Sequence, residues 1–408
     1  MPMPSDPPSP RAWRLAPSRA HAQDVVSKLV VHGAASDQTV LVPYSPGLEY
    51  VVVATEGEVR SVGTEGDFRV EPMGALATVW ARARLALFFK KKKYLRFKEF
   101  SLYSRGPKPE RKRFTTFNQH MFNTGVALDG DLVTSHPELL QGWPEIEPPA
   151  VRPLGPVKTA IVAHVYYEET WPDFAEVLKR LAVPFDLIVT TVPGRERLAE
   201  AVKREFPWGE VVVSENRGRD VRPFLTLLEQ GRLDRYAYVC KLHGKKSSDG
   251  GRMAYLGSLW RRRLLFDLLA GPDIAAKIIA ALERDPGIGM IGPHAFRLPS
   301  AIYSEKLAWG SGNRETILAL ARRMGVPAER FRLDFFGGTM FWVRPEALRP
   351  LRDLKLPGDF LEEEGLLDGG LEHAVERLFA TSTVAAGYRL ADSDGLVVLD
   401  AASAESSG

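Results

Sequence analysis

Two short polar segments, ENRGRD at 215–220 and KLHGKK at 241–246, carry the residues with the most evident chemistry, and each follows an apolar run. They contribute an amide, a carboxylate and mostly basic side chains, at Asn216, Arg217, Gly218, Arg219, Asp220, Lys241, His243 and Lys245. Guanidinium groups form bidentate contacts with phosphate that lysine cannot form. Fixed cations also stabilise the charge that develops on a leaving diphosphate. These residue types therefore predict a site for an anionic ligand that bears phosphate.

The elements around these segments are predicted to bring both to one place. Each segment ends a predicted β-strand, and ligands of parallel sheets bind in the crevice outside the carboxyl ends of the strands. Lys241 and His243 alternate at the end of an apolar run, so their side chains point to one face of the strand. Gly218 permits a left-handed backbone between strand and helix. Asp220 is predicted to cap the helix that begins at Val221, while the loop as a whole is interpreted as part of a ligand site.

A proline-rich stretch, WPEIEPPAVRPLGP, marks a predicted linker at 144–156, and the pattern beyond it alternates between strand and helix. Strands are predicted at 158–167, 185–191, 209–215, 236–243, 287–292 and 337–344. Helices are predicted at 171–182, 194–206, 220–230, 252–269, 273–284, 314–325 and 365–380. Strands separated by helices of about 10–15 residues imply βαβ units. The sequence thus predicts an α/β domain over 157–395, with a Rossmann-type, mostly parallel sheet and flanking helices, followed by a tail at 396–408.

The C-terminal part of the chain offers side chains for proton transfer. Three glutamates at 362–364 are predicted to open a helix, where the helix dipole favours acids. Asp368 and Glu372, four residues apart, are expected to share a helix face. A carboxylate there is a candidate general base if it lies within hydrogen-bond reach of an acceptor hydroxyl. His373, five residues after Asp368, is expected about 140° away from it around the helix, so the two do not form an obvious catalytic pair. His164 ends the first predicted strand, either as a residue that lines the crevice or as a satisfied structural histidine.

The N-terminal part has a different composition. Residues 1–23 are rich in Pro, Ser and Ala and are predicted to form a disordered arm, and 24–143 a small β-rich module with a helix at 74–97. Within 82–113 thirteen Lys or Arg face two acids and alternate with aromatic and aliphatic residues. This basic region (residues 74–113) is typical of a helix at an anionic membrane surface, and equally of a helix packed on its own domain with a solvated end. Nucleic-acid binding is a weaker interpretation, because no known nucleic-acid motif accompanies the charge.

Bulk properties exclude several classes of protein. The formal net charge of the 408 residues is +3, so an anion site depends on local clusters. The single cysteine, Cys240, excludes an intrachain disulfide and a cysteine-based zinc site, and it is predicted to be buried and inert. No apolar run reaches the ~18 residues of a membrane span, and no apolar signal core follows the N-terminus, so a cytoplasmic protein is expected. GxSxG, P-loop, HExxH and GxGxxG motifs are absent.

From about 158 to 389 the chain resembles the rhamnan synthesis protein F family, glycosyltransferase-like proteins of bacterial cell-surface polysaccharide assembly. The segments that carry the resemblance are AHVYY, PFDLIVTT, ENRGRDVRPFL, YVCKLHGKKS, DPGIGMIGP, GGTMFWVRPEAL and LLDGGLEHAVERL. The resemblance implies a GT-A-like nucleotide-sugar-binding fold. In GT-A enzymes the strand after the glycine turn ends in Asp-x-Asp, which holds a divalent metal on the diphosphate. Here that position reads Lys241-Leu242-His243, and Mg²⁺ prefers oxygen ligands, so we hypothesise that Lys241 and His243 replace the metal as counter-charges.

The leading hypothesis is an inverting-type glycosyltransferase that transfers rhamnose or a related deoxysugar from a donor such as dTDP-rhamnose to a glycan or lipid-linked acceptor. Asp368 is the expected base with His373 as a second catalytic residue. The donor site is expected to comprise His164, Asn216, Arg217, Gly218, Arg219, Asp220, Lys241, His243 and Lys245. The basic region would allow peripheral contact with the inner membrane. The alternative is a non-catalytic module on the same fold that binds a glycan or assembles partners, because a fold does not determine a function.

Overall fold

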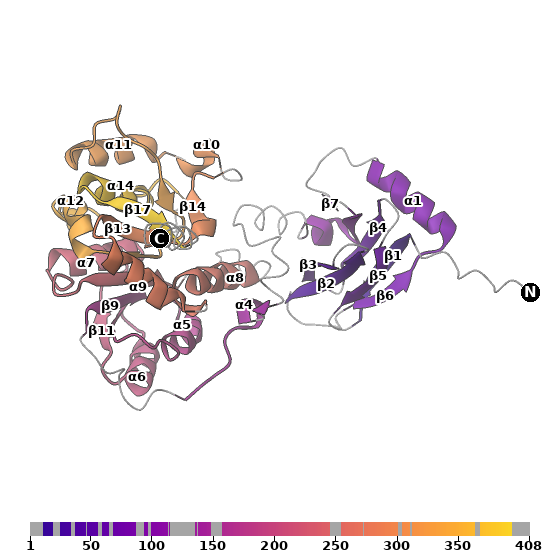
Figure 1. Cartoon of the computed structure of the whole chain (residues 1–408), viewed down its shortest axis with the longest axis horizontal. Coiled ribbons are helices and arrows are strands. Elements are labelled where there is room, and N and C mark those ends of the chain that lie inside the picture. Colours follow the sequence, from indigo (N-terminus) through magenta and orange to yellow (C-terminus); the bar gives the residue numbers. More distant parts are fainter. Residues whose placement is uncertain are drawn as a thin grey trace, which may run out of the picture. The chain divides into compact units, whose positions relative to one another are not determined.

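The computed structural model describes residues 11–18, 25–33, 37–45, 47–55, 59–64, 68–86, 94–96, 99–112, 114, 135–136, 138–147, 157–244, 254–271, 273–300, 304–310, 312–363 and 368–393. The chain divides into two compact units (Figure 1). Unit 1 comprises 1–141 and 247–260, and unit 2 comprises 142–246 and 261–408. Among the described residues, no helix combines the length and the apolar character needed to cross a bilayer.

Unit 1 contains two antiparallel sheets, with strand orders β6-β1-β4-β8-β7 and β3-β2-β5. The strands are β1 Ala12–Pro17, β2 Val25–Gly33, β3 Asp37–Tyr44, β4 Glu49–Ala54, β5 Val59–Thr64, β6 Phe68–Pro72, β7 Tyr94–Arg96 and β8 Phe100–Arg105. Side chains of β4 alternate between two environments, as the period of a strand requires. Tyr50 and Val52 enter the core that both sheets share, whereas Val51 and Val53 enter a second cluster on the opposite face. Helix α1 (Ala75–Ala86) packs on that second cluster through Ala81.

Two predictions for this unit are wrong in part. The arm expected over 1–23 includes β1, which pairs with both β4 and β6 and buries Trp13 and Leu15. The composition of the arm hid this short apolar segment, because its stability comes from its two neighbouring strands. The helix expected at 74–97 ends at Ala86, and β7 pairs with β8 instead. The linker prediction falls mostly outside the described residues, as does the tail.

Unit 2 is built on a mixed, mostly parallel sheet of order β11-β10-β9-β12-β16-β13-β17. These strands are β9 Thr159–His164, β10 Asp186–Thr191, β11 Glu210–Val213, β12 Tyr238–His243, β13 Ile288–Gly292, β16 Phe341–Val343 and β17 Arg389–Asp392. Only β16 pairs antiparallel with its neighbours in this sheet as described. A separate two-stranded ribbon joins β14 (Arg297–Leu298) to β15 (Phe335–Phe336). The predicted α/β class is confirmed, and β17 is a strand that the periodicity did not predict.

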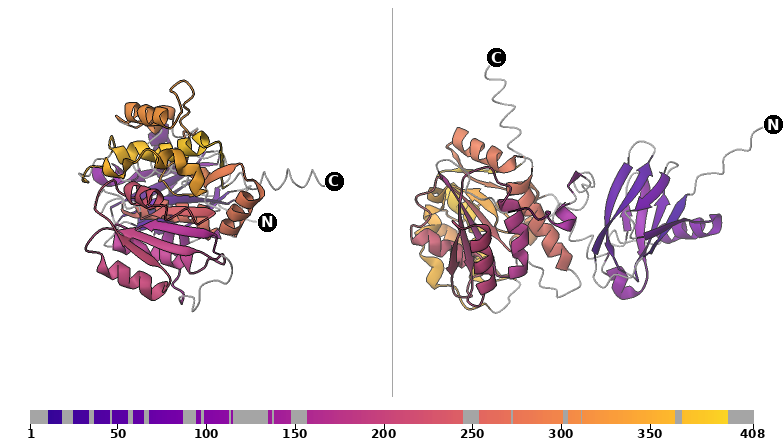
Figure 2. Two further views of the ribbon diagram at one scale, coloured as in Figure 1. Left: turned by 90° about the vertical axis from the view of Figure 1, so that its left-hand side faces the viewer. Right: turned by 90° about the horizontal axis from the view of Figure 1, so that it is seen from below.

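Helices cover both faces of this sheet (Figure 2). On one face Phe341 packs against Phe224 and Phe379, and on the other Trp342 donates from Nε1 to the carbonyl of Leu268 at 3.0 Å. The helices are α5 Trp171–Leu178, α6 Glu196–Glu205, α7 Val221–Glu229, α8 Ala254–Leu265, α9 Ile274–Arg284, α10 Glu305–Ala308, α11 Arg314–Arg323, α12 Arg349–Arg352, α13 Leu371–Glu376 and α14 Leu378–Ala385. The short helical turns are η2 Glu168–Thr170, η3 Phe266–Ala270, η4 His294–Phe296, η5 Pro345–Leu348 and η6 Leu356–Gly358. Cys240 is fully buried as predicted, and burial raises the pKa of its thiol.

The order of the strands fixes where a ligand is expected. From β9 the chain builds β10 and β11 on one side and then crosses back to add β12 on the other side. Ligands of open α/β sheets bind at the carboxyl ends of the strands where the order reverses. That switch point lies between β9 and β12, which end at His164 and His243.

Candidate functional site

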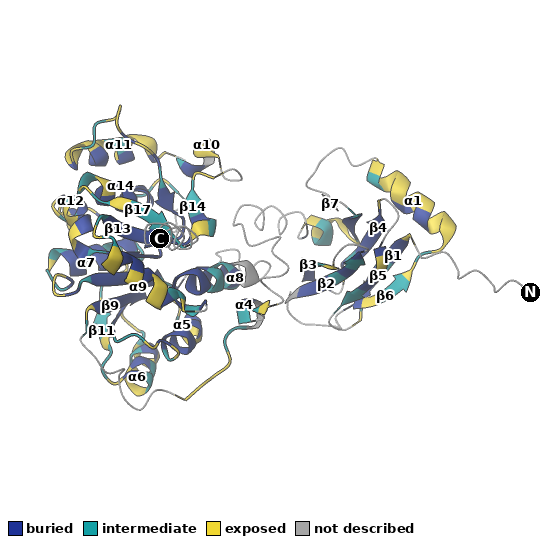
Figure 3. Cartoon of the chain, viewed as in Figure 1, coloured by how far each residue is buried: buried dark blue, intermediate teal, exposed yellow. Residues whose placement is uncertain are grey.

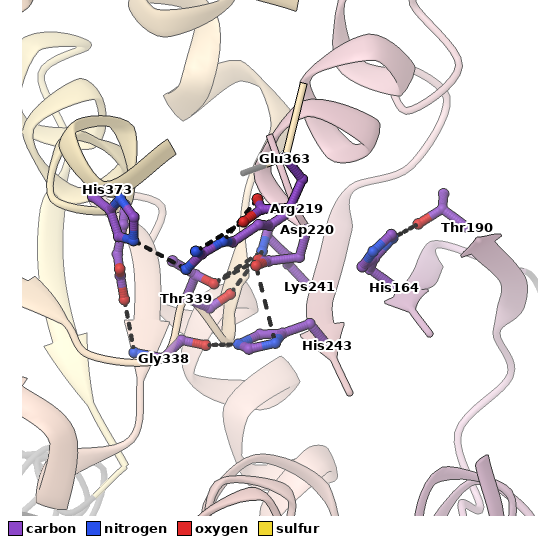
Figure 4. A network of polar contacts seen from close by, with 11 residues as sticks. His164, Thr190, Arg219, Asp220, Lys241, His243, Gly338, Thr339, Glu363 and His373 are labelled. Carbon is purple, nitrogen blue, oxygen red and sulfur yellow. Dashed lines mark hydrogen bonds and ion pairs between the residues drawn. The ribbon is translucent and has the colours of Figure 1, made fainter. Parts of the chain in front are cut away.

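The switch point collects side chains from four parts of unit 2 (Figure 4). His164 and His243 are register partners at the ends of β9 and β12. Because β16 runs antiparallel to β12, its first residues stand at the same edge, and Lys241 pairs with Phe341. The turn just before β16 therefore places Gly338 and Thr339 beside the end of β12. The loop after β11 adds Arg219 and Asp220.

Asp220 is the centre of this cluster. Its Oδ2 accepts from Lys241 Nζ at 2.5 Å and from Thr339 Oγ1 at 2.7 Å, and its Oδ1 lies 4.0 Å from His243 Nδ1. Burial alone would raise the pKa of Asp220, but the charges of His243 and Lys241 and these hydrogen bonds outweigh burial and hold the pKa well below its usual range. Asp220 is therefore a fixed anion at neutral pH.

Three predictions about Asp220 and the acidic segment are wrong. Asp220 is the N-cap residue of α7, yet its side chain makes no capping hydrogen bond, because the carboxylate is engaged by Lys241. Glu362 and Glu363 are not helical either, and Glu364 lies outside the described residues. The next helix that the structure describes begins at Leu371, and Asp368 precedes it without sharing a helix face with Glu372.

Lys241 is 1% exposed, and its ammonium has a complete set of protein partners. Besides Asp220 it donates to the carbonyl and the hydroxyl of Thr339, at 3.0 and 3.2 Å. The Nζ atom also lies 5.6–6.0 Å from the ring centres of Phe224, Phe341 and Phe379. An ammonium so enclosed cannot contact a diphosphate directly, which corrects that part of the counter-charge hypothesis. The geometry gives Lys241 a positioning role: it holds Asp220.

The two histidines differ in their surroundings. His243 donates from Nε2 to the carbonyl of Gly338 at 2.5 Å, which leaves Nδ1 toward Asp220. The turn is held in place because the Gly338 N–H donates to Glu376 Oε1 at 3.1 Å. His164 is buried and lies 3.0 Å from Thr190 Oγ1 through Nδ1. Its burial lowers the pKa to about 4, so His164 is neutral at physiological pH.

Arg219 links this cluster to the C-terminal helices. Its Nε and Nη2 atoms donate to Glu363 at 3.0 and 3.1 Å, and Nη1 lies 3.0 Å from His373 Nε2. On the other side of the ring, Nδ1 of His373 lies 3.1 Å from Glu372 Oε1 and 3.2 Å from the Gly370 backbone nitrogen. Arg219 itself has a φ of +52°, next to Gly218 at +60°. Non-glycine residues in this region are uncommon, and they cluster at functional sites.

The rest of the ENRGRD loop differs in exposure: Glu215 and Asn216 are exposed, Arg217 is half-buried and Gly218 is buried. Gly218 has the predicted left-handed backbone, and a Cβ there would overlap the Phe360 ring, so no other residue fits. Arg217 pairs with Glu215 at 3.4 Å and with Glu362 at 3.2 Å and is 38% exposed. Asn216 is exposed, and its carbonyl accepts from the Glu363 N–H at 3.4 Å. Lys245 lies outside the described residues.

Asp368 belongs to a neighbouring cluster. Its Oδ1 accepts from Asn313 Nδ2 and from the Gly369 N–H, and its Oδ2 lies 3.9 Å from Arg377 Nη2. Arg377 in turn donates from Nη1 to the carbonyl of His373 at 2.6 Å. Asp368 is thus connected to the Asp220 cluster through Arg377, His373 and Arg219.

Several residues of the site were not identified from the sequence as site residues. They are Gly338, Thr339, Glu376, Asn313 and Arg377. The GGT triplet before β16 was a possible signal, because adjacent glycines indicate close backbone approach. Its location at the site follows only from the antiparallel placement of β16.

An aromatic and arginine cluster stands at the same edge. Tyr166 and Tyr167 lie two and three residues after the end of β9 at His164, with ring centres 4.8 Å apart. Arg195, which follows β10, lies with its guanidinium carbon 5.2 Å from the Tyr166 ring centre and donates to the Tyr166 carbonyl at 2.9 Å. Tyr167 is exposed and Tyr166 and Arg195 are partly exposed, and aromatic and guanidinium planes can stack on a planar ring.

The metal that the fold resemblance implies does not fit these residues. A divalent cation needs several oxygen ligands. The carboxylate of the cluster, Asp220, already accepts through Oδ2 from the Lys241 ammonium and the Thr339 hydroxyl. Within the described residues, no group of three or more His, Cys, Asp or Glu side chains is arranged to hold a metal ion.

One family model matches a segment that lies mostly in unit 2. The family model described as "Rhamnan synthesis protein F" matches residues 146–388. Two proteins described as "Uncharacterized protein WxcX", from two strains of Xanthomonas campestris pv. campestris, are each 32% identical over 232 residues. These alignments cover 56% of this chain and 32% of each relative, so the chain spans about a third of the length of these relatives.

Proposed function

Because the chain belongs to the rhamnan synthesis protein F family, we propose that it is a glycosyltransferase of polysaccharide synthesis that uses a nucleotide-sugar donor. The donor carries rhamnose or a related deoxysugar, for example as dTDP-rhamnose, and the acceptor is a glycan or a lipid-linked glycan. The observation that carries the proposal is the cluster of Asp220, His243 and Arg219 at the switch point of the sheet. Its strand order, with one antiparallel strand beside the site, supports the GT-A-like interpretation.

In the proposed reaction an acceptor hydroxyl oxygen forms a bond to the anomeric carbon of the donor. The bond from that carbon to the diphosphate oxygen breaks, and the nucleoside diphosphate leaves. The proton of the hydroxyl passes to a carboxylate. Asp220 is a poor base, because a carboxylate whose pKa is held so low binds a proton weakly. We assign the base to Asp368, which keeps 25% of its side chain exposed.

The leaving diphosphate needs cations that it can reach. Arg217 and Arg219 are 38% and 37% exposed, and each is paired with a glutamate of the 362–363 segment. We propose that the diphosphate takes the place of these glutamates, since guanidinium binds phosphate in the same bidentate way. Tyr166 and Arg195 supply a platform for the base of the donor nucleotide.

Titration calorimetry with dTDP-rhamnose tests the donor site. Arg219→Lys is expected to weaken donor binding by about tenfold, because lysine cannot bind bidentately. The matched control is Arg352→Lys, which alters an arginine paired with Asp234 away from the cluster. Glu363→Gln is expected to tighten binding, because it removes the competing carboxylate. Unchanged donor affinity in both Arg219→Lys and Glu363→Gln would show that the diphosphate does not bind beside Arg219.

Release of dTDP in the presence of acceptor tests catalysis. Asp368→Asn is expected to lower the transfer rate by at least about a hundredfold and to leave donor affinity unchanged. The enclosed Lys241 at the Asp-x-Asp position favours a second candidate, a non-catalytic module that binds the donor or a glycan. Donor binding with no dTDP release above that of Asp368→Asn, across a panel of acceptors, would support this second candidate.

A further inference from the structure

Helix α1 of unit 1 presents apolar side chains to solvent. Leu76 is 81% exposed, Val79 63% and Trp80 76%. Successive residues of a helix are rotated by about 100°, so these three and the exposed Ala83 form one stripe at spacings of three and four residues. We call this stripe of Leu76, Val79, Trp80 and Ala83 the outer face of α1. It is coloured as exposed in Figure 3.

The opposite side of α1 accounts for its packing. Thr78 and Ala81 are buried, and Leu85 is half-buried against the cluster on the β1, β4 and β8 strands. On the helix, the mean direction of these residues is about 180° from that of the outer face. Packing on the unit's own sheet therefore explains one side of the helix and leaves the outer face unexplained.

The charge of the sequence around α1 indicates what kind of surface the outer face would bind. Residues 74–98 contain eight Lys or Arg and no acid. Two of these, Arg82 and Arg84, lie on opposite sides of the outer face around the helix. Arg82 donates to the Ala54 carbonyl at 3.2 Å, and the guanidinium carbon of Arg84 lies 5.8 Å from the Tyr103 ring centre. Both are exposed along much of their length. An apolar stripe with a tryptophan, bordered by cations and free of acids, matches the boundary between acyl chains and anionic headgroups.

We propose that the outer face of α1 docks the chain on an anionic lipid bilayer, with Leu76, Val79 and Trp80 entering the headgroup boundary and Arg82 and Arg84 meeting the headgroups. Duplex DNA offers negative charge without an apolar phase, so it does not account for three exposed apolar side chains. A second copy of the chain would bring the same positive charge and is disfavoured by repulsion.

Flotation of the full chain with vesicles tests the proposal. The chain is expected to bind vesicles of phosphatidylcholine with 30% phosphatidylglycerol at least about tenfold more tightly than vesicles of phosphatidylcholine alone, since each basic residue near the surface strengthens binding severalfold. Replacing Leu76, Val79 and Trp80 together by serine is expected to reduce binding by at least about tenfold. The control is Val384→Ser, which changes an apolar residue of unit 2 that is 56% exposed.

Circular dichroism of the triple variant establishes that it is folded, as expected for three exposed side chains. Equal flotation of wild type and triple variant overturns the proposal, as does absence of flotation. Binding to duplex DNA but not to vesicles assigns the surface to nucleic acid and overturns it too. Dimerisation that the triple variant abolishes, without vesicle binding, would assign the outer face to a second copy.

Discussion

Lys241→Met is the most informative single change in unit 2, because it removes one charge and keeps the length and apolar stem of the side chain. The wild-type ammonium is 1% exposed and lies 2.5 Å from Asp220 Oδ2, whose side chain is 13% exposed. Methionine preserves the packing against Phe224, Phe341 and Phe379, so little cavity forms. The change therefore isolates the loss of a buried cation.

The expected loss of stability depends on the Asp220 carboxylate, which stays buried without its cation in Lys241→Met. Removing one partner of a buried ion pair leaves an uncompensated charge and typically costs about 3–5 kcal/mol. The double variant Lys241→Met with Asp220→Asn leaves no charge, and the Thr339 hydroxyl still has an acceptor. We expect the double variant to lose less than half as much stability as Lys241→Met, and the difference measures the coupling of the pair.

The assay is urea denaturation followed by fluorescence at pH 7. Lys158→Met is the matched control, because Lys158 and Glu283 form a pair 3.3 Å apart whose side chains are 59% and 49% exposed. Such a surface pair contributes about 0–1 kcal/mol. A loss for Lys241→Met no larger than that for Lys158→Met would refute the argument that Lys241 holds a buried anion.

The pH dependence provides an independent check on the same pair. The pKa of Asp220 is lowered in the folded state, so the contribution of this carboxylate is complete above its unfolded pKa of about 3.9 and is lost as the pH falls toward the folded pKa. Protonation also removes the unpaired charge of the variant. Without Lys241 the pKa of Asp220 in the folded variant lies above that in the wild type, so the stability difference between wild type and Lys241→Met is expected to shrink as the pH falls below the pKa of the variant.

Three further outcomes are expected. Gly218→Ala should destabilise unit 2 by about 2–4 kcal/mol in urea denaturation, because its φ is +60° and the new Cβ meets Phe360 and lies 2.8 Å from Arg222 Cβ. The control is Gly325→Ala, where φ is +83° and nothing lies within 4 Å of the new Cβ, so only the backbone cost of ~1 kcal/mol is expected. Equal losses of stability in the two variants would contradict the packing argument. Burial lowers the pKa of His164 to about 4, so between pH 6.5 and 4 the unfolded chain binds more protons than the folded chain, and His164 should cost about 3 kcal/mol of wild-type stability as the pH falls through that window. The melting temperature of His164→Gln should depend less on pH in the same window than that of wild type. Parallel curves of melting temperature against pH would contradict this prediction. Sugar transfer should keep its rate in EDTA, measured as dTDP release, and a loss that Mg²⁺ restores would contradict a metal-independent site.

Sequence reasoning was most successful where one element carries the information. The alternation of strands and helices predicted the α/β class, and the period of β12 predicted that Lys241 and His243 share a face. Gly218 indicated the left-handed turn. Each of these depends on local sterics and on the period of one element, which the order of residues determines directly.

The partners of these residues depended on tertiary structure. Asp220 has every local mark of a helix cap, yet a lysine 21 residues away and Thr339 claim its carboxylate. Thr339 reaches it only because β16 inserts antiparallel beside β12. Likewise, the basic and apolar composition of 74–113 could not show which residues of the helix pack on its own unit. The structure shows that α1 buries Ala81 on one side and exposes Leu76, Val79 and Trp80 on the other. Which residues border a strand end, and which face of a helix stays bare, are set by strand order and packing between segments far apart in the chain.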